Sequence, residues 1–178
     1  MKFDAVLRAW KEFFEREGIR YALAGGLAMH AWGRSRTTHD VDFVVDGAQQ
    51  ARALAFAESI GYQTFHSSEG YSNHDHPDHD FGRVDLIYIY GSTADAIFAA
   101  ARPRASFGGV ELPVADAEHL IAMKLAAVKN APRRVPIDMP DVEYLMSLPG
   151  IDRAKVREYF AKNGLLRILD GIETNRYR

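Results

Sequence analysis

Two carboxylates separated by a single residue open an apolar run. They are Asp40 and Asp42, and the run is Asp-Val-Asp-Phe-Val-Val. Side chains two apart on a strand point to the same face, so a strand here predicts that both carboxylates project together. Two carboxylates this close repel each other and lose solvation, and a divalent cation between them would relieve both costs. The pair is therefore a candidate metal site.

A glycine pair, Gly25-Gly26, lies between an expected strand at residues 21–24 and an expected short helix at residues 27–32. Glycine suits a tight turn in which backbone N–H groups approach an anion at the start of a helix. A phosphate cradle beside a divalent-metal site favours phosphoryl or nucleotidyl transfer. In the following loop, Arg34 and Arg36 either neutralise the two aspartates or contact a triphosphate.

A third carboxylate, Asp85, is the only acid in an otherwise strand-like run at residues 83–90. An ionised carboxylate buried there without a partner would be costly. One interpretation places Asp85 on the exposed face of an edge strand. The other places its strand beside Asp40 and Asp42, so that three carboxylates form one cluster.

A lysine, Lys124, falls within the apolar stripe of a helix expected to follow a cap at Asp116. Such a lysine either extends its ammonium to the surface or reaches an internal anion. We favour the internal anion, either a substrate phosphate or the carboxylate cluster.

A polar segment at residues 66–80 contains His74, His76 and His79 among aspartates. This composition permits a metal site, and with it a metal-binding hydrolase. Pro77 and the lack of a regular pattern favour a flexible loop instead.

The 178 residues are 47% hydrophobic, contain no cysteine and carry a formal net charge of −2. Disulfides and thiolate zinc sites are excluded, and the charge gives no global signal for nucleic-acid binding. The N-terminus lacks a signal-peptide pattern and no apolar run is long enough to cross a membrane, so a soluble cytoplasmic protein is expected. We expect a core at residues 1–115 and a helical segment at residues 116–178 packed on it.

These motifs together resemble a known superfamily. Gly25-Gly26, then Arg36-x-Thr38-x-Asp40-x-Asp42, then one aspartate on a later strand, are similar to the polymerase-beta-type nucleotidyltransferases. Within it, the sequence most resembles the AbiEii-type toxin and small antibiotic nucleotidyltransferase branch. The helix at residues 120–127, which contains Lys124, and the later motif Asp138-x-x-Asp141 extend the likeness.

The resemblance implies an α+β fold: a mixed β-sheet nucleotidyltransferase core with packed helices and a small C-terminal helical part. It implies that Asp40 and Asp42 hold two Mg²⁺ ions, and that Asp85 ligates the second and helps to activate an acceptor hydroxyl. The substrate-binding residues would be Gly25, Gly26, Arg36, Thr38 and Lys124. NMP would move from an NTP to an RNA end such as that of tRNA, to a protein or to a small molecule, and an antitoxin partner is possible. The alternative is a catalytically idle domain that binds a nucleotide or a partner.

Overall fold

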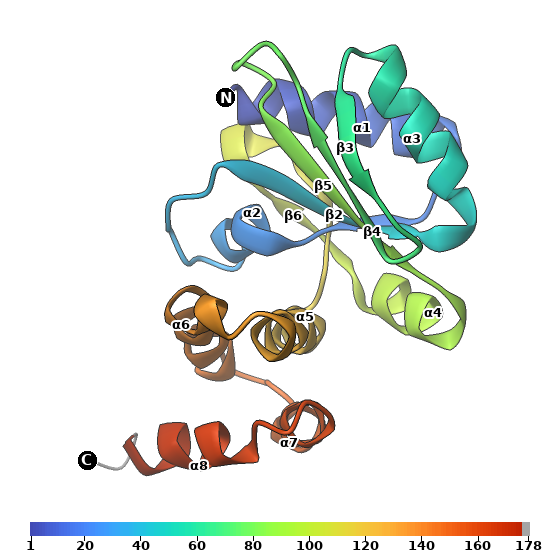
Figure 1. The fold of residues 1–178 in the computed structure, drawn as a ribbon. Coiled ribbons are helices and arrows are strands. Elements are labelled where there is room, and N and C mark those ends of the chain that lie inside the picture. The colour runs from blue at the N-terminus through green and yellow to red at the C-terminus, as the bar shows by residue number, and fades with distance from the viewer. Residues whose placement is uncertain (176–178) are drawn as a thin grey trace. The chain divides into compact units, whose positions relative to one another are not determined.

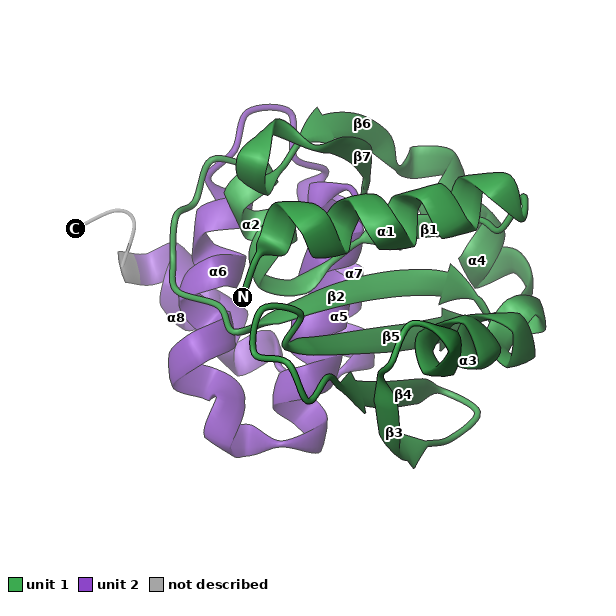
Figure 2. Ribbon diagram, turned by 90° about the horizontal axis from the view of Figure 1, so that it is seen from above, with its two compact units in different colours: residues 1–115 green, residues 116–178 purple. Residues whose placement is uncertain are grey.

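Two compact units make up the chain in this computed structural model, which describes residues 1–175. The first unit is Met1–Ala115 and the second is Asp116–Arg178 (Figures 1 and 2). Each unit is described by itself below.

A mixed seven-stranded sheet forms the centre of the first unit, in the order β3-β4-β5-β2-β1-β7-β6 (Figure 1). Its strands are β1 Tyr21–Leu23, β2 Asp40–Asp46, β3 Gln63–Ser67, β4 Tyr71–Asp75, β5 Arg83–Ile89, β6 Arg102–Ala105 and β7 Glu111–Val114. The β2–β5 and β1–β7 pairs are parallel, and the other pairs are antiparallel. The predicted α+β fold with a mixed sheet is confirmed.

The helices of this unit are α1 Phe3–Arg16, α2 Gly25–Ala31, α3 Gln50–Ser59 and α4 Gly91–Ala100. Helices α1 and α3 lie on one side of the sheet (Figure 2). The indole of Trp10 on α1 packs 6.2 Å from the ring of Phe43 on β2 and 5.1 Å from that of Phe56 on α3. This aromatic layer buries the sheet face that carries Phe43. Because successive strand residues point to opposite faces, the side chains of Asp40 and Asp42 lie on the other face.

The segment expected as an irregular loop at residues 66–80 belongs to a β-hairpin up to Asp75, so that part of the prediction was wrong, whereas residues 76–80 lie outside the strands and helices. Strand β4 pairs with both β3 and β5. Its inward residues are polar, yet Ser72 and His74 are completely buried. They satisfy each other: Ser72 Oγ lies 2.7 Å from His74 Nε2 and 2.7 Å from the Tyr88 hydroxyl. Buried polar groups that are hydrogen-bonded in this way allow a strand without an apolar pattern.

The second unit is helical, with α5 Ala117–Asn130, α6 Val135–Met146, α7 Arg153–Lys162 and α8 Leu166–Asn175. Asp116 caps α5 as expected, since its carboxylate accepts a hydrogen bond of 2.8 Å from the backbone N–H of His119. Helix α6 begins directly after a short 3-10 turn at Pro132–Arg134. All four helices contribute buried apolar side chains, which include Leu120, Ile121, Leu125, Val142, Leu145, Phe160 and Leu169. None of the helices in the described chain is long and apolar enough to cross a membrane.

Candidate active site

Three carboxylates converge on one face of the sheet in the first unit. Parallel pairing of β2 with β5 places Asp42 directly beside Asp85, and Asp40 beside Arg83. One ligand oxygen from each of Asp40, Asp42 and Asp85 lies within 4.8 Å of the other two. The structure thus brings together the three aspartates that the sequence singled out, and Asp85 is not on an edge strand.

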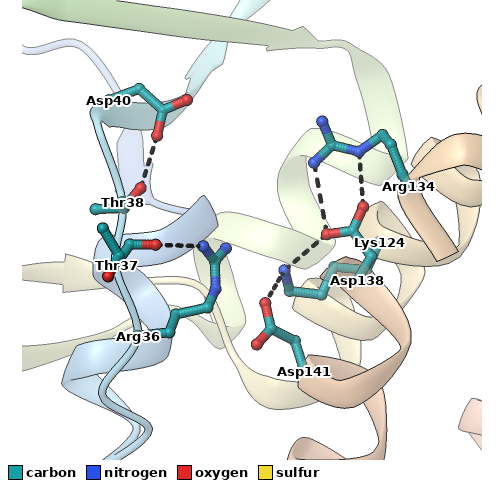
Figure 3. Close-up of polar contacts among 8 residues, drawn as sticks. All are labelled: Arg36, Thr37, Thr38, Asp40, Lys124, Arg134, Asp138 and Asp141. Atoms are coloured by element: carbon teal, nitrogen blue, oxygen red, sulfur yellow. Dashed lines mark hydrogen bonds and ion pairs between the residues drawn. The ribbon is translucent and has the colours of Figure 1, made fainter. Parts of the chain in front are cut away.

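Two carboxylates of this triad, those of Asp40 and Asp85, are each held by a neighbouring side chain. The Thr38 hydroxyl donates a 2.7 Å hydrogen bond to Asp40 Oδ1 (Figure 3). Arg83 donates from Nε to Asp85 Oδ1 at 2.8 Å and from Nη2 to Asp85 Oδ2 at 3.0 Å. These hydrogen bonds raise the pKa of the Arg83 guanidinium, and the negative charges of Asp85, Asp40 and Asp42 act in the same direction. The triad therefore attracts and holds positive charge.

Arg83 is the residue of this site that the sequence reasoning missed. The signal was available, because residues two apart on a strand share a face and Arg83 stands two before Asp85. The apolar pattern of residues 83–90 predicts the strand but does not indicate this ion pair.

The glycine pair packs against the carboxylates. Gly25 is the first residue of α2 and has φ +57°, a left-handed conformation that favours glycine. A Cβ at Gly25 would lie 1.7 Å from Asp42 Oδ2, and one at Gly26 would lie 2.4 Å from Thr38 Oγ1. Both glycines are thus required by the close approach of site side chains. Their expected contact with phosphate stays a prediction.

Arg36 lies in the loop between α2 and β2 and is half-buried. One of its guanidinium nitrogens, Nη1, donates to the backbone oxygen of Thr37 at 3.1 Å (Figure 3). Its expected contact with a triphosphate also stays a prediction.

The histidines of residues 74–80 do not form a metal site. His74 has both ring nitrogens engaged, with Thr64 Oγ1 2.9 Å from Nδ1 and Ser72 Oγ on Nε2, and burial lowers its pKa. His76 Nδ1 accepts a hydrogen bond from the backbone N–H of Asp78. Across the described residues, Asp40, Asp42 and Asp85 form the only group of three acids or histidines close enough to share an ion. The interpretation as a histidine-based hydrolase is therefore wrong.

Lys124 is buried within the second unit, in a cluster of charges (Figure 3). Its Nζ lies 2.6 Å from Asp141 Oδ2 and 3.2 Å from Asp138 Oδ1, and Arg134 Nε donates to Asp138 Oδ2 at 2.7 Å. Asp138 and Asp141 are themselves completely buried. The internal anions that Lys124 reaches within its unit are these carboxylates, and its expected contact with substrate stays a prediction.

The triad fits a hard divalent cation. Mg²⁺ prefers oxygen ligands and is commonly held by one or two carboxylates together with substrate phosphates. The donor set of Asp40, Asp42 and Asp85 supplies such oxygens close together. Asp42 is further fixed by the glycine against which it packs, which limits how far its carboxylate can move.

Several solved structures resemble the chain in fold. The solution structure of the antibiotic-resistance factor ANT(2'')-Ia gives a TM-score of 0.69 at 14% identity and covers 99% of each chain. The lincosamide antibiotic adenylyltransferase LnuA, with lincomycin bound, gives 0.56 at 17% identity and covers 80% of this chain and 96% of its own. An antigenic nucleotidyltransferase-like protein from Paracoccidioides brasiliensis gives 0.58 at 14% identity and covers 97% and 90%. At these identities the likeness establishes a shared fold.

A search of curated proteins gives no match. Residues 8–176, nearly the whole sequence, match the family described as nucleotidyl transferase AbiEii toxin, type IV TA system. The match includes the three aspartates, the glycine pair and the buried lysine. The chain belongs to the AbiEii family of nucleotidyltransferases.

Proposed function

We propose that this protein is an active, metal-dependent nucleotidyltransferase that moves NMP from an NTP to a hydroxyl acceptor. The observation that carries the proposal is the convergence of Asp40, Asp42 and Asp85 on adjacent parallel strands. Three carboxylates so close are mutually repulsive, and a site that retains all three is suited to cations.

In this proposal Asp40 and Asp42 would hold two Mg²⁺ ions, and Asp85 would be a ligand of the second. Bound Mg²⁺ would offset the charge of the triphosphate and of the departing pyrophosphate, and would make the acceptor hydroxyl more acidic. Thr38 keeps the Asp40 carboxylate oriented through its hydrogen bond. Gly25 leaves room for Asp42, and Gly26 leaves room for Thr38.

In this proposal Asp85 acts as the general base in the transfer. The acceptor oxygen forms a bond to the α-phosphorus while the bond from that phosphorus to the pyrophosphate oxygen breaks. The hydroxyl proton passes to the Asp85 carboxylate, and pyrophosphate leaves. Before this step Arg83 must release at least one Asp85 oxygen, because its guanidinium occupies both. Backbone N–H groups at Gly25 and Gly26, together with Arg36, would orient the triphosphate.

The acceptor and the biological setting are also proposals. A crystal structure of ANT(2'')-Ia contains adenylyl-2''-tobramycin, and LnuA is solved with lincomycin, so small hydroxylated molecules are one class to test. The family description refers to a toxin of a type IV TA system, so RNA or protein acceptors and an antitoxin partner are the others. A cytoplasmic location is consistent with all of them.

A second candidate is a nucleotide-binding domain that performs no transfer. The specific observation in its favour is the bidentate pair between Arg83 and Asp85, which neutralises the third carboxylate without any metal. In that case Asp85 would be a structural partner of Arg83 and not a base.

Labelled NTPs separate these candidates. The protein is incubated with each NTP labelled in the α-phosphate, with Mg²⁺ or with EDTA, and with total RNA, tobramycin or lincomycin as acceptor. Transfer that requires Mg²⁺ and disappears in Asp42→Asn supports the proposal. NTP binding without transfer to any acceptor supports the second candidate, and absence of Mg²⁺-dependent NTP binding contradicts both.

A further inference from the structure

Four strands contribute one row of side chains to the face that carries the triad. The row runs from His66 on β3 through Asn73 on β4 and Asp85 on β5 to Asp42 on β2, since these residues pair in register. Directly paired residues share a face of a sheet. Asn73 therefore stands beside Asp85 on the side away from Asp42. Its side-chain amide makes no hydrogen bond within residues 1–175.

Exposed aromatic rings surround Asn73 on this face. Tyr71 pairs with Ile87 two positions along from Asp85 and is 47% exposed. The ring of His66 stacks on Tyr71 with centroids 4.6 Å apart. Phe65, next to the register shift in β3, is 57% exposed, and the Arg83 guanidinium lies 5.0 Å from its ring centre. We call Phe65, His66, Tyr71 and Asn73 the outer platform.

The charges near this platform do not suit a polyanion. The next row across the strands is Gln63, Asp75, Arg83 and Asp40. The two rows together carry one arginine and four aspartates, namely Asp40, Asp42, Asp75 and Asp85. If the triad held two Mg²⁺ ions, the two rows would carry a net charge of only +1, because Asp75 balances Arg83. Nucleic-acid strands are bound through several lysines or arginines along the phosphates.

We propose that the outer platform binds the acceptor, and that the acceptor is a neutral or cationic ring compound that carries hydroxyl groups. The inference rests on the proposed function, because it places the second substrate of the same transfer beside Asp85. The rings of Phe65 and Tyr71 pack against the ring of the acceptor, and against any amino group that it carries. Asn73 holds the reacting hydroxyl next to the Asp85 carboxylate.

Transfer kinetics with defined acceptors test this assignment. AMP transfer from α-labelled ATP with Mg²⁺ is measured with tobramycin, lincomycin and tRNA, for the parent and for Phe65→Ala and Tyr71→Ala. The matched control is Phe107→Ala, an aromatic residue of similar exposure, 45%, whose ring packs on Phe3 outside the platform. Thermal melting checks that all variants remain folded, as expected for side chains this exposed.

The expected result is transfer to tobramycin or lincomycin, with the acceptor KM raised at least about fivefold in each platform variant. The KM for ATP stays unchanged, and Phe107→Ala behaves as the parent. An unchanged acceptor KM in both platform variants would overturn the location of the subsite. Transfer to tRNA alone, or Mg²⁺-dependent ATP binding with no transfer to either ring compound, would overturn the acceptor class while leaving nucleotide binding intact. Absence of Mg²⁺-dependent ATP binding by the unmodified protein would instead overturn the proposed function, and this inference with it.

Discussion

Substituting alanine at Gly25 tests whether the glycine pair exists to accommodate the triad. Gly25 and Gly91 form a matched pair, since each is the first residue of a helix, with φ +57° and +58°. A Cβ at Gly91 meets no atom within 4 Å, whereas one at Gly25 overlaps the Asp42 side chain, at 1.7 Å from Oδ2 and 2.8 Å from Cβ. Rotation of the carboxylate alone cannot relieve a contact that includes Cβ.

The two variants share one cost and differ in another. Placing a Cβ at a left-handed φ costs about 1–2 kcal/mol at either position. Displacing Asp42 adds about 1–3 kcal/mol at Gly25 only, in the range seen for overpacked sites. Urea unfolding gives these differences, and calorimetry gives the affinity for ATP with Mg²⁺. We expect Gly25→Ala to be the less stable variant and to lose Mg²⁺–ATP binding, while Gly91→Ala retains it. Equal stability and equal binding in the two variants would show that Gly25 is not needed to make room for Asp42.

Three further substitutions probe the hydrogen bonds and charges around the core. Lys124→Met removes the ammonium that reaches the buried Asp138 and Asp141, so urea unfolding should show a loss of about 3–5 kcal/mol; a change below about 1 kcal/mol would contradict it. Burial lowers the pKa of His74, so the unfolded state binds a proton on this side chain more readily than the folded state. The free energy of unfolding should therefore fall as the pH drops below about 6.5, by at most about 1.4 kcal/mol per pH unit. Urea unfolding of His74→Gln between pH 5 and pH 8, values chosen to bracket the unfolded pKa, should lack this slope, and an unchanged slope would contradict the assignment. Thr38→Val keeps the side-chain shape but removes the hydroxyl that donates to Asp40. Calorimetry should therefore show weaker Mg²⁺–ATP binding, with a change in unfolding free energy of about 1 kcal/mol or less. Unaltered binding would argue against a positioning role for Thr38.

The sequence predicted the parts of this protein whose signal is local. Asp40 and Asp42 share a face because of strand periodicity, and an acid in an apolar strand drew attention to Asp85. That β5 lies beside β2 is a matter of sheet order, which local periodicity does not contain. The residues alone gave the three-carboxylate cluster as one of two interpretations of Asp85, and the resemblance to known nucleotidyltransferases implied the same cluster.

Features that depend on tertiary pairing could not be predicted from the sequence. Strand β4 has no apolar pattern because the buried residues Ser72 and His74 are satisfied by each other and by Tyr88, far along the chain. The carboxylate partners of Lys124 lie 14 and 17 residues away, on the next helix. A buried lysine indicates that an anion is near, but only the fold identifies which one.

The third carboxylate decides between nucleotidyl transfer and nucleotide binding alone, so Asp85→Asn separates the two functions directly. AMP transfer from labelled ATP and the affinity for Mg²⁺–ATP are measured on the same preparation. Asp75→Asn serves as control, because Asp75 lies on the same sheet face and pairs in register with Arg83. We expect Asp85→Asn to retain ATP binding and to lose at least about a hundredfold in transfer rate, while Asp75→Asn retains both. Transfer by Asp85→Asn at the parent rate would show that Asp85 is neither the base nor a required metal ligand.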